Sequence, residues 1–118
     1  MKIVVLDTDF ILNATKNNMD IERSIKEMCS TPIKISIIDK TLDELKDKPL
    51  SEIAKKIISE FHIIKTNKQQ TVDDLILDYV NHNKNAIIAT QDRKLKEKLK
   101  KRKIVIITIR QQKRLIFA

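Results

Sequence analysis

The sequence contains no glycine, and this absence excludes one large class of ligand site. Phosphate-cradling loops of the Walker and dinucleotide-binding types need glycines, because the backbone has to come close to the ligand. Nucleotide binding by either of those routes is therefore excluded.

Cysteine and histidine are scarce as well, with one cysteine, Cys29, and two histidines, His62 and His82. A single cysteine allows neither an intrachain disulfide nor a cysteine-based zinc site, and neither histidine has a second ligand at metal spacing. We therefore expect Cys29 to pack in the core and both histidines to be structural.

Long hydrophobic runs are missing: no stretch approaches the roughly 18 apolar residues that a membrane span requires, and no signal peptide opens the chain. We expect a cytoplasmic protein with no membrane partner. With 118 residues, of which 42% are hydrophobic and 34% charged, the chain should fold as a single domain over residues 1–118.

Basic residues outnumber acidic ones. Lys and Arg number 24 against 16 Asp and Glu, which gives a formal net charge of +8. Such a balance suits a polyanionic partner, most simply nucleic acid, although a lysine-rich surface alone would look the same.

Short apolar runs rich in β-branched residues alternate with amphipathic stretches, which predicts an α/β sandwich around a mostly parallel sheet. The predicted strands are Ile3–Leu6, Ile33–Ile37, His62–Ile64, Ala86–Ala89 and Ile104–Ile109. The predicted helical stretches are Phe10–Ala14, Ile21–Cys29, Leu42–Lys46, Ile53–Phe61, Val72–Val80 and Arg93–Lys101. Pro49 should start a helix, where its missing N–H is tolerated, and the apolar end of the chain should add a short strand or docked segment.

Acidic residues stand at every junction between a strand and the next helix. They are Asp7 after the first strand, Glu44 after the second, Asp73 and Asp74 after the third, and Asp92 after the fourth. In open α/β sheets the working site lies beyond the carboxyl ends of the strands, so these acids should share one edge.

Each acid also has an ordinary structural explanation. Thr41 with Glu44, and Thr71 with Asp74, have the spacing of a capping box, while Asp9 and Asp92 would make good helix N-caps. Asp7 fits that explanation least, because it ends a buried strand. Burying an unpaired carboxylate is unfavourable, and clustering several is worse, unless a cation compensates. Oxygen ligands without histidine or cysteine favour Mg²⁺ or Mn²⁺, which activate water at phosphodiesters.

Four motifs in this order resemble those of the PIN-domain ribonucleases: "VVLDTDFIL", "LDEL", "VDDLI" and "IATQDRKLKEKL". The resemblance covers essentially the whole chain, and lies nearer the branch involved in small ribosomal subunit assembly than typical VapC toxins. It implies a three-layer sandwich with a five-stranded parallel sheet in the order 3-2-1-4-5, and cleavage of single-stranded RNA with Mg²⁺ or Mn²⁺.

The resemblance also implies which residues form the site. The metal-site acids would be Asp7, Glu44, Asp74 and Asp92, with Asp74 favoured over Asp73 because it directly precedes "LI". Thr8 and Thr90 match supporting hydroxyl positions, and Asp9 would either add a charge to the site or cap the first helix.

The segment "DRKLKEKLKKRK" predicts a helix that starts at Asp92 and becomes basic along its length. Leu95 and Leu99 would face the core, which leaves the basic residues toward solvent. The candidates for phosphate contact are Arg93, Lys94, Lys98 and Arg102.

Three other functions stay open at this stage. A haloacid-dehalogenase-like phosphatase would use Asp7 as nucleophile and Asp9 as general acid, with Mg²⁺ held by Asp73 and Asp74. A catalytically weak PIN domain would act as an RNA-binding scaffold in ribosome assembly. A VapC-like toxin would be silenced by an antitoxin peptide, and processing of ribosomal RNA and homodimer formation are further expectations.

Overall fold

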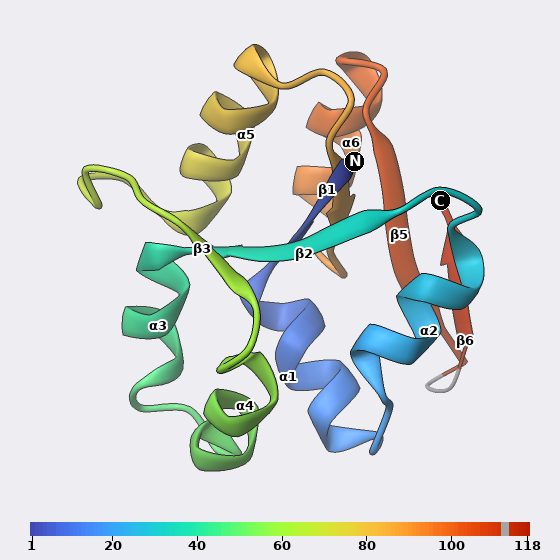
Figure 1. Ribbon diagram of the computed structural model, residues 1–118. Helices are drawn as coiled ribbons and strands as arrows, with labels where there is room; N and C mark the ends of the chain where they lie inside the picture. Colours follow the sequence, from blue (N-terminus) through green and yellow to red (C-terminus); the bar gives the residue numbers. More distant parts are fainter. Residues whose placement is uncertain (112–113) are drawn as a thin grey trace.

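A six-stranded sheet forms the centre of the protein in a computed structural model that describes residues 1–111 and 114–118 (Figure 1). The strands are β1 (Lys2–Leu6), β2 (Ile33–Ile38), β3 (His62–Ile64), β4 (Ile87–Ala89), β5 (Val105–Arg110) and β6 (Arg114–Phe117). Their spatial order is β3-β2-β1-β4-β5-β6. The predicted order of the first five, all parallel, is confirmed. The sheet as a whole is mixed, because β6 pairs antiparallel with β5.

Six helices lie between the strands in this part of the chain. They are α1 (Thr8–Lys16), α2 (Ile21–Met28), α3 (Asp39–Leu45), α4 (Ser51–Ile58), α5 (Val72–His82) and α6 (Arg93–Lys101). The buried residues of α1 to α4 pack on one face of the sheet, and those of α5 and α6 pack on the other (Figure 1). The predicted α/β sandwich of three layers is therefore confirmed. None of these helices is long and apolar enough to cross a membrane.

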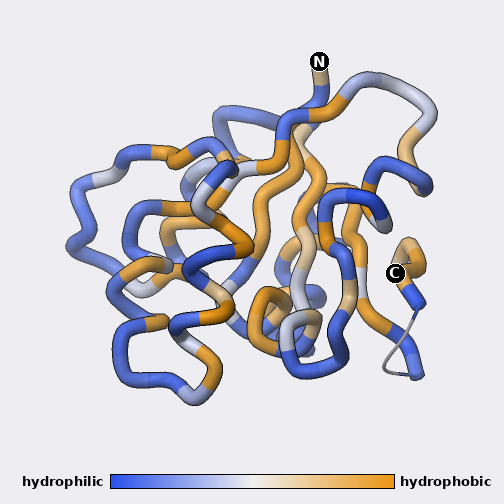
Figure 2. Tube along the Cα trace, turned by 60° about the horizontal axis from the view of Figure 1, so that its bottom comes forward, coloured by the Kyte–Doolittle hydropathy of each residue, from blue (hydrophilic) through white to orange (hydrophobic). Residues whose placement is uncertain are grey.

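The first strand runs through the middle of the core. Val4, Val5 and Leu6 are fully buried, with Val4 and Leu6 facing the α1–α4 layer and Val5 facing the α5–α6 layer. Hydrophobic colouring accordingly concentrates on the strands in the interior (Figure 2). Each such side chain contributes about 1.5–3 kcal/mol by its burial.

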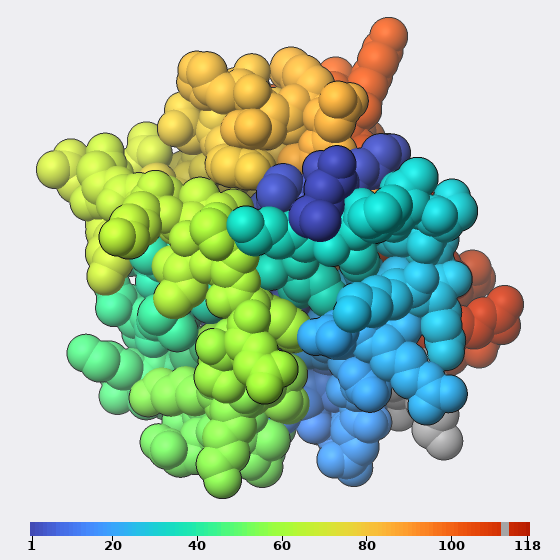
Figure 3. Space-filling view, in the orientation of Figure 1, coloured from blue at the N-terminus to red at the C-terminus, as the bar shows by residue number. Residues whose placement is uncertain are grey.

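The two ends of β1 lie in different surroundings. Its amino end reaches the surface beside the carboxyl end of α5 (Figure 3), where Met1 and Lys2 line a shallow pocket with Tyr79 and His82. Its carboxyl end leads directly into the buried Asp7. The first acid therefore lies buried where the chain passes from β1 into α1.

Cys29, expected in the core, is half-buried and packs against the α1–α4 layer.

The start of α4 differs from the sequence prediction. Pro49 does not begin the helix, because Leu50 follows it in the left-handed region, with φ 68° and ψ 9°, and α4 starts at Ser51. The Leu50 carbonyl accepts the first helical hydrogen bond, from the Ala54 N–H at 2.9 Å. A leucine in this conformation is strained, because its Cβ crowds the backbone.

The strain at Leu50 predicts an unusual stabilising substitution. Leu50→Gly should raise the free energy of unfolding by about 0.5–1 kcal/mol, because glycine adopts positive φ without a steric penalty. Chemical denaturation measures this change. As a control, Ile53→Gly, at an exposed position inside α4, should lower the free energy of unfolding by about 1 kcal/mol. A destabilised Leu50→Gly protein would instead place Leu50 within the helix.

Candidate functional site

Asp7 occupies the junction of β1 and α1 and is only 3% exposed. Its Oδ1 accepts a hydrogen bond from the Thr8 N–H at 2.9 Å, so Asp7 itself is the N-cap of α1. Its Oδ2 accepts from the Thr90 hydroxyl at 2.7 Å. Thr90 Oγ1 in turn accepts from the Asp92 N–H at 3.0 Å. One hydroxyl thus ties the end of β1 to the loop that follows β4.

A cavity of about 390 Å³ lies at this carboxyl edge of the sheet. Five of the residues that line it are acidic, and they come from four different strand–helix junctions. The lining residues are Asp7, Thr8, Asp9, Leu12, Glu44, Lys48, Asp73 and Asp92. The structure therefore brings together the acids that the sequence placed on one edge, with one exception among the pair on α5.

That exception concerns Asp73 and Asp74. Asp73 lines the cavity, whereas Asp74 is exposed and does not. The Asp74 N–H donates to Thr71 Oγ1 at 3.2 Å, which makes Thr71 the N-cap of α5. Successive residues of a helix point about 100° apart, so only one of two adjacent acids can face the site. The preference for Asp74 as a metal ligand was based on its place before "LI", whereas in the structure Asp73 is the acid of this pair that faces the cavity.

Glu44 is available to the cavity because the predicted capping box does not form. The helix α3 begins at Asp39, so Thr41 lies within it, and Thr41 Oγ1 is buried without a hydrogen-bond partner among the described residues. Glu44 Oε1 instead accepts from the Thr8 hydroxyl at 2.6 Å. Thr8 and Thr90 therefore each hold one carboxylate of the site.

The loop between β4 and α6 is fixed by Gln91. Its Oε1 accepts from Thr108 Oγ1 at 2.7 Å and from the Ile109 N–H at 2.6 Å, which ties the loop to β5. Its own N–H donates to Asp9 Oδ1 at 3.3 Å. Asp9 does not cap α1, because Asp7 is the N-cap and Asp9 lies in the first turn of the helix.

Asp92 both caps a helix and lines the cavity. Its Oδ1 accepts from the Leu95 N–H at 3.0 Å, as expected for the N-cap of α6. Its carboxylate also raises the pKa of Asp73, which shows that the two lie within electrostatic reach. The structural and the functional explanation of this residue are thus compatible.

Crowding of the carboxylates shifts two of their pKa values. Burial, followed by the negative charge of Asp9, raises the pKa of Asp7 to about 8, although the Thr90 hydrogen bond opposes this rise. Burial, followed by the charges of Asp92 and Asp9, raises the pKa of Asp73 to about 6. The cavity therefore holds more negative charge than the protein alone compensates, which is the condition that a cation would relieve.

The donor set fits a hard divalent cation. The cavity presents carboxylate and hydroxyl oxygens, and neither histidine nor cysteine lines it. These are the ligands that suit Mg²⁺ and Mn²⁺. Within residues 1–111 and 114–118, however, no three such side chains converge closely enough to hold one ion. The acids surround the cavity instead of meeting at one point.

The basic helix α6 starts at the cavity as predicted, and Arg93, Lys94 and Lys98 are exposed on it. Arg102 is placed differently. Its Nε donates to Asn81 Oδ1 at 3.2 Å, so it ties the far end of α6 to α5. That position is about 15 Å along the helix axis from Asp92.

Two lysines near the acids were not among the predicted residues. Lys48 lines the cavity from the turn that follows α3. Lys96 is half-buried one helical turn after Asp92, and its N–H donates to the Asp92 carbonyl at 3.0 Å. A helical projection of α6 from its cap would have found Lys96, whereas nothing in the sequence fixes the direction of the turn that carries Lys48.

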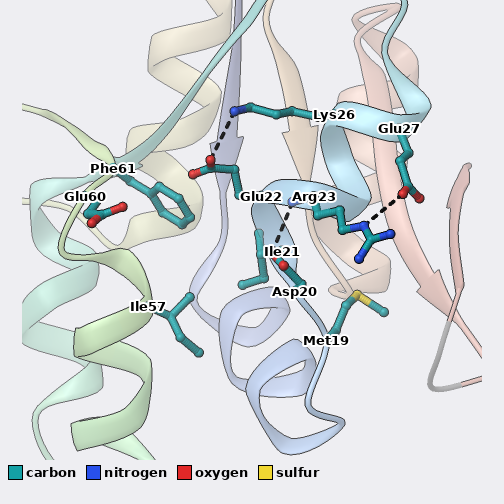
Figure 4. A pocket seen from close by; sticks show the side chains of 10 residues that line it. All are labelled: Met19, Asp20, Ile21, Glu22, Arg23, Lys26, Glu27, Ile57, Glu60 and Phe61. Atoms are coloured by element: carbon teal, nitrogen blue, oxygen red, sulfur yellow. Dashed lines mark hydrogen bonds and ion pairs between the residues drawn. The ribbon is translucent and has the colours of Figure 1, made fainter.

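A larger cavity, of about 660 Å³, lies between α2 and the end of α4 and contains none of the predicted site residues. Ile57 and Phe61 face Ile21 across it (Figure 4). Two ion pairs within α2 border it, Lys26 with Glu22 at 3.0 Å and Arg23 with Glu27 at 3.2 Å. The acidic edge, not this cavity, is therefore the candidate active site.

The PIN-like domain family matches residues 4–112, so the chain belongs to this family. The resemblance drawn from the four motifs is thereby confirmed, and the phosphatase alternative is wrong. Ribonuclease VapC4 of Methanocaldococcus jannaschii is 28% identical over 121 residues, which cover 93% of this chain and 92% of that protein. A solved structure of the PIN domain endonuclease Utp24 matches with a TM-score of 0.84 at 24% identity, covering 98% of this chain and 90% of that one. The latter match confirms the fold.

The raised pKa of Asp7 predicts how the metal-free protein responds to pH. A carboxyl whose pKa is about 8 when folded and about 4 when unfolded binds its proton more tightly in the folded state. The free energy of unfolding in chelator should therefore fall as pH rises from about 4 to about 8. Asp7→Asn keeps the cap and removes the charge, so its melting temperature should equal or exceed that of the wild type, by a margin that grows over this range.

Thermal melts at several pH values, with chelator and then with millimolar Mn²⁺, check this prediction. Asp7→Asn should also lose most of the melting-temperature gain that Mn²⁺ gives the wild type, because a ligand stabilises only the state that binds it. Asp74→Asn, which removes an exposed carboxylate outside the cavity, serves as the control and should keep that gain. If Asp7→Asn lowers the melting temperature and Mn²⁺ does not change the melting temperature of the wild type, Asp7 is only a helix cap.

Proposed function

We propose that the protein is an endoribonuclease that cleaves single-stranded RNA with the help of Mg²⁺ or Mn²⁺. The observation that carries this proposal is the ring of carboxylates around one cavity, in a chain of the PIN-like domain family. They are Asp7, Asp9, Glu44, Asp73 and Asp92. The ribonuclease and endonuclease names of the two relatives support the same reaction class.

Asp7, Asp73, Glu44 and Asp92 would supply carboxylate oxygens to the metal by turning toward one another from their positions around the cavity, with Asp9 as a further carboxylate beside them. Asp73 takes the place that the sequence gave to Asp74. When bound, Mg²⁺ or Mn²⁺ supplies an activated water and neutralises charge on the phosphodiester.

The protein's own contribution is to hold these oxygens in fixed directions. The Thr90 hydroxyl orients Asp7 and the Thr8 hydroxyl orients Glu44. A carboxylate oxygen that accepts one hydrogen bond has a second lone pair with which it can bind a cation. Gln91 keeps the Asp92 loop in place through its bonds to β5. Neutral donors of this kind position the acids without cancelling the charge that attracts the cation.

Binding of RNA would be led by the backbone phosphates. Aromatic residues make up only 3% of the chain, so base stacking contributes little, whereas exposed basic residues extend along α6 from the cavity. Arg93, Lys94 and Lys98 stay the phosphate-contact candidates on that helix. Affinity should therefore depend steeply on salt and weakly on RNA sequence.

The biological setting stays a prediction in three respects. Processing of ribosomal RNA, a VapC-like toxin paired with an antitoxin, and a scaffold role in ribosome assembly all use the same fold and site. Homodimer formation is a further expectation. Sequencing the RNA that crosslinks to an Asp7→Asn protein in cells separates ribosomal RNA from other targets.

The two acids that open α5 give the sharpest test of the proposed reaction. Asp73→Asn should lower the rate of RNA cleavage by about 10²-fold or more, because a carboxylate that faces the cavity is removed. Asp74→Asn should stay close to the wild-type rate, because its side chain is exposed outside the cavity. The assay follows cleavage of an unstructured, end-labelled RNA with Mg²⁺ or Mn²⁺ and with chelator.

The pair of variants is matched, since both replace Asp by Asn in the same helical turn. The reverse result, loss of cleavage with Asp74→Asn alone, would restore the original choice of ligand. A wild-type protein that cuts no unstructured RNA with either metal would favour the scaffold role.

A further inference from the structure

Two lysines follow acids of the cavity at the same spacing along the chain. Lys48 stands four residues after Glu44, and Lys96 stands four residues after Asp92. In the sheet, β2 and β4 lie on either side of β1, so the segments that follow them flank Asp7. Lys48 lines the cavity on one side of Asp7, and Lys96 lies one helical turn beyond Asp92 on the other side.

Neither lysine is held by a carboxylate. Among residues 1–111 and 114–118, Lys48 is the one basic residue that lines the cavity. Its position comes from the turn after α3, where its N–H donates to the Leu45 carbonyl at 3.2 Å. In the described part of the chain, ion pairs join Arg23 with Glu27, Lys26 with Glu22, and Lys68 with Asp43, and none of them includes Lys48 or Lys96.

Lys96 is set apart from the other lysines of α6. It is half-buried, whereas its neighbours Lys94 and Lys98 are exposed. It lies within electrostatic reach of the site, since Asp9 and Asp92 act on its pKa against the lowering effect of burial and of Lys100. Lys96 therefore lies on the side of α6 that is nearer the acids, whereas Lys94 and Lys98 point into the solvent.

An RNA strand that enters this cavity meets an electrostatic obstacle. The phosphate to be cleaved can share the metal, but the phosphates before and after it face five carboxylates with no cation of their own. Like charges at short range repel, most strongly where water is partly excluded. A positive side chain on each side of Asp7 would remove this repulsion.

We propose, resting on the ribonuclease function above, that Lys48 and Lys96 bind the two phosphates that flank the cleaved one. The RNA strand then runs along the carboxyl edge of the sheet, from the turn after α3 to the first turn of α6. Lys48 and Lys96 are binding residues for the substrate backbone, and they act on phosphates at some distance from the bond that breaks.

A comparison of substrate length tests this assignment. A dinucleotide has one phosphodiester and no flanking phosphates, whereas a longer unstructured oligonucleotide has both. In the wild type, kcat/KM should rise with length. In Lys48→Ala and in Lys96→Ala this gain should shrink about ten-fold, as for loss of one charge-assisted contact, and cleavage of the dinucleotide should fall by a smaller factor than cleavage of the long oligonucleotide.

Matched controls and two further measurements separate the outcomes. Lys46→Ala, just after α3, and Lys101→Ala, at the end of α6, each remove one exposed positive charge away from the cavity and should keep the full gain. Oligonucleotide binding in Ca²⁺ should weaken in both test variants, with a salt slope reduced by about 0.7 for each lysine. The melting-temperature gain from Mn²⁺ should stay equal or increase, because a positive charge near the metal is removed.

Equal length dependence in all variants would overturn the proposal while leaving the ribonuclease function intact. An equal loss on the dinucleotide, or a smaller Mn²⁺ gain, would overturn it too, because the lysines would then act at the metal site. If the wild type cleaves nothing, the ribonuclease function fails. The binding assay still decides the lysines in that case, since unchanged affinity and salt slope would overturn their assignment.

Discussion

Mutual repulsion among carboxylates at one edge of the sheet is the constraint on which the rest of the structure depends. Asp7 is almost fully buried at that edge, and burial together with its acidic neighbours raises its pKa to about 8. Such an arrangement opposes folding. It persists because β1, which carries Asp7, is packed on both faces by hydrophobic residues from two helical layers. The burial of hydrophobic residues on both faces of β1 therefore offsets the unfavourable free energy of the buried carboxylate.

The polar contacts around the acids share one property: they fix the orientation of the carboxylates without neutralising their negative charge. Thr8 and Thr90 donate from hydroxyls, and Gln91 anchors its loop to β5 with an amide. The two nearby lysines, Lys48 and Lys96, form no ion pair with the acids. The acids thus keep the negative charge that the proposed metal would neutralise, and the two lysines keep the positive charges that the proposed RNA would contact.

The sequence predicted the parts of the fold that depend on periodicity. The alternation of strands and helices followed from the apolar runs, whereas the strand order came from the resemblance to the PIN-domain ribonucleases. The places of the acids after strands predicted that they would share one edge, and the structure brings Asp7, Glu44, Asp73 and Asp92 to one cavity there. The sequence did not predict that Asp73, and not Asp74, faces the cavity, because this depends on the rotation of α5 about its axis. The capping box of Thr41 and Glu44 does not form, because α3 already begins at Asp39. The prediction that Pro49 starts a helix was wrong, because Leu50 adopts a left-handed conformation and α4 begins at Ser51. Such local geometry is set by tertiary packing, which the pattern alone does not contain.

The central claim is that the repelling carboxylates exist to hold a divalent cation. Anomalous diffraction from crystals of the wild-type protein soaked in Mn²⁺ tests it most directly, because the signal locates the metal without reference to activity. The account predicts a strong anomalous peak inside the cavity, within ligand distance of Asp7 and Asp73, that is absent from Asp7→Asn crystals treated in the same way. Saturating Mn²⁺ with no peak in the cavity, or a peak beside Asp74 alone, would contradict it.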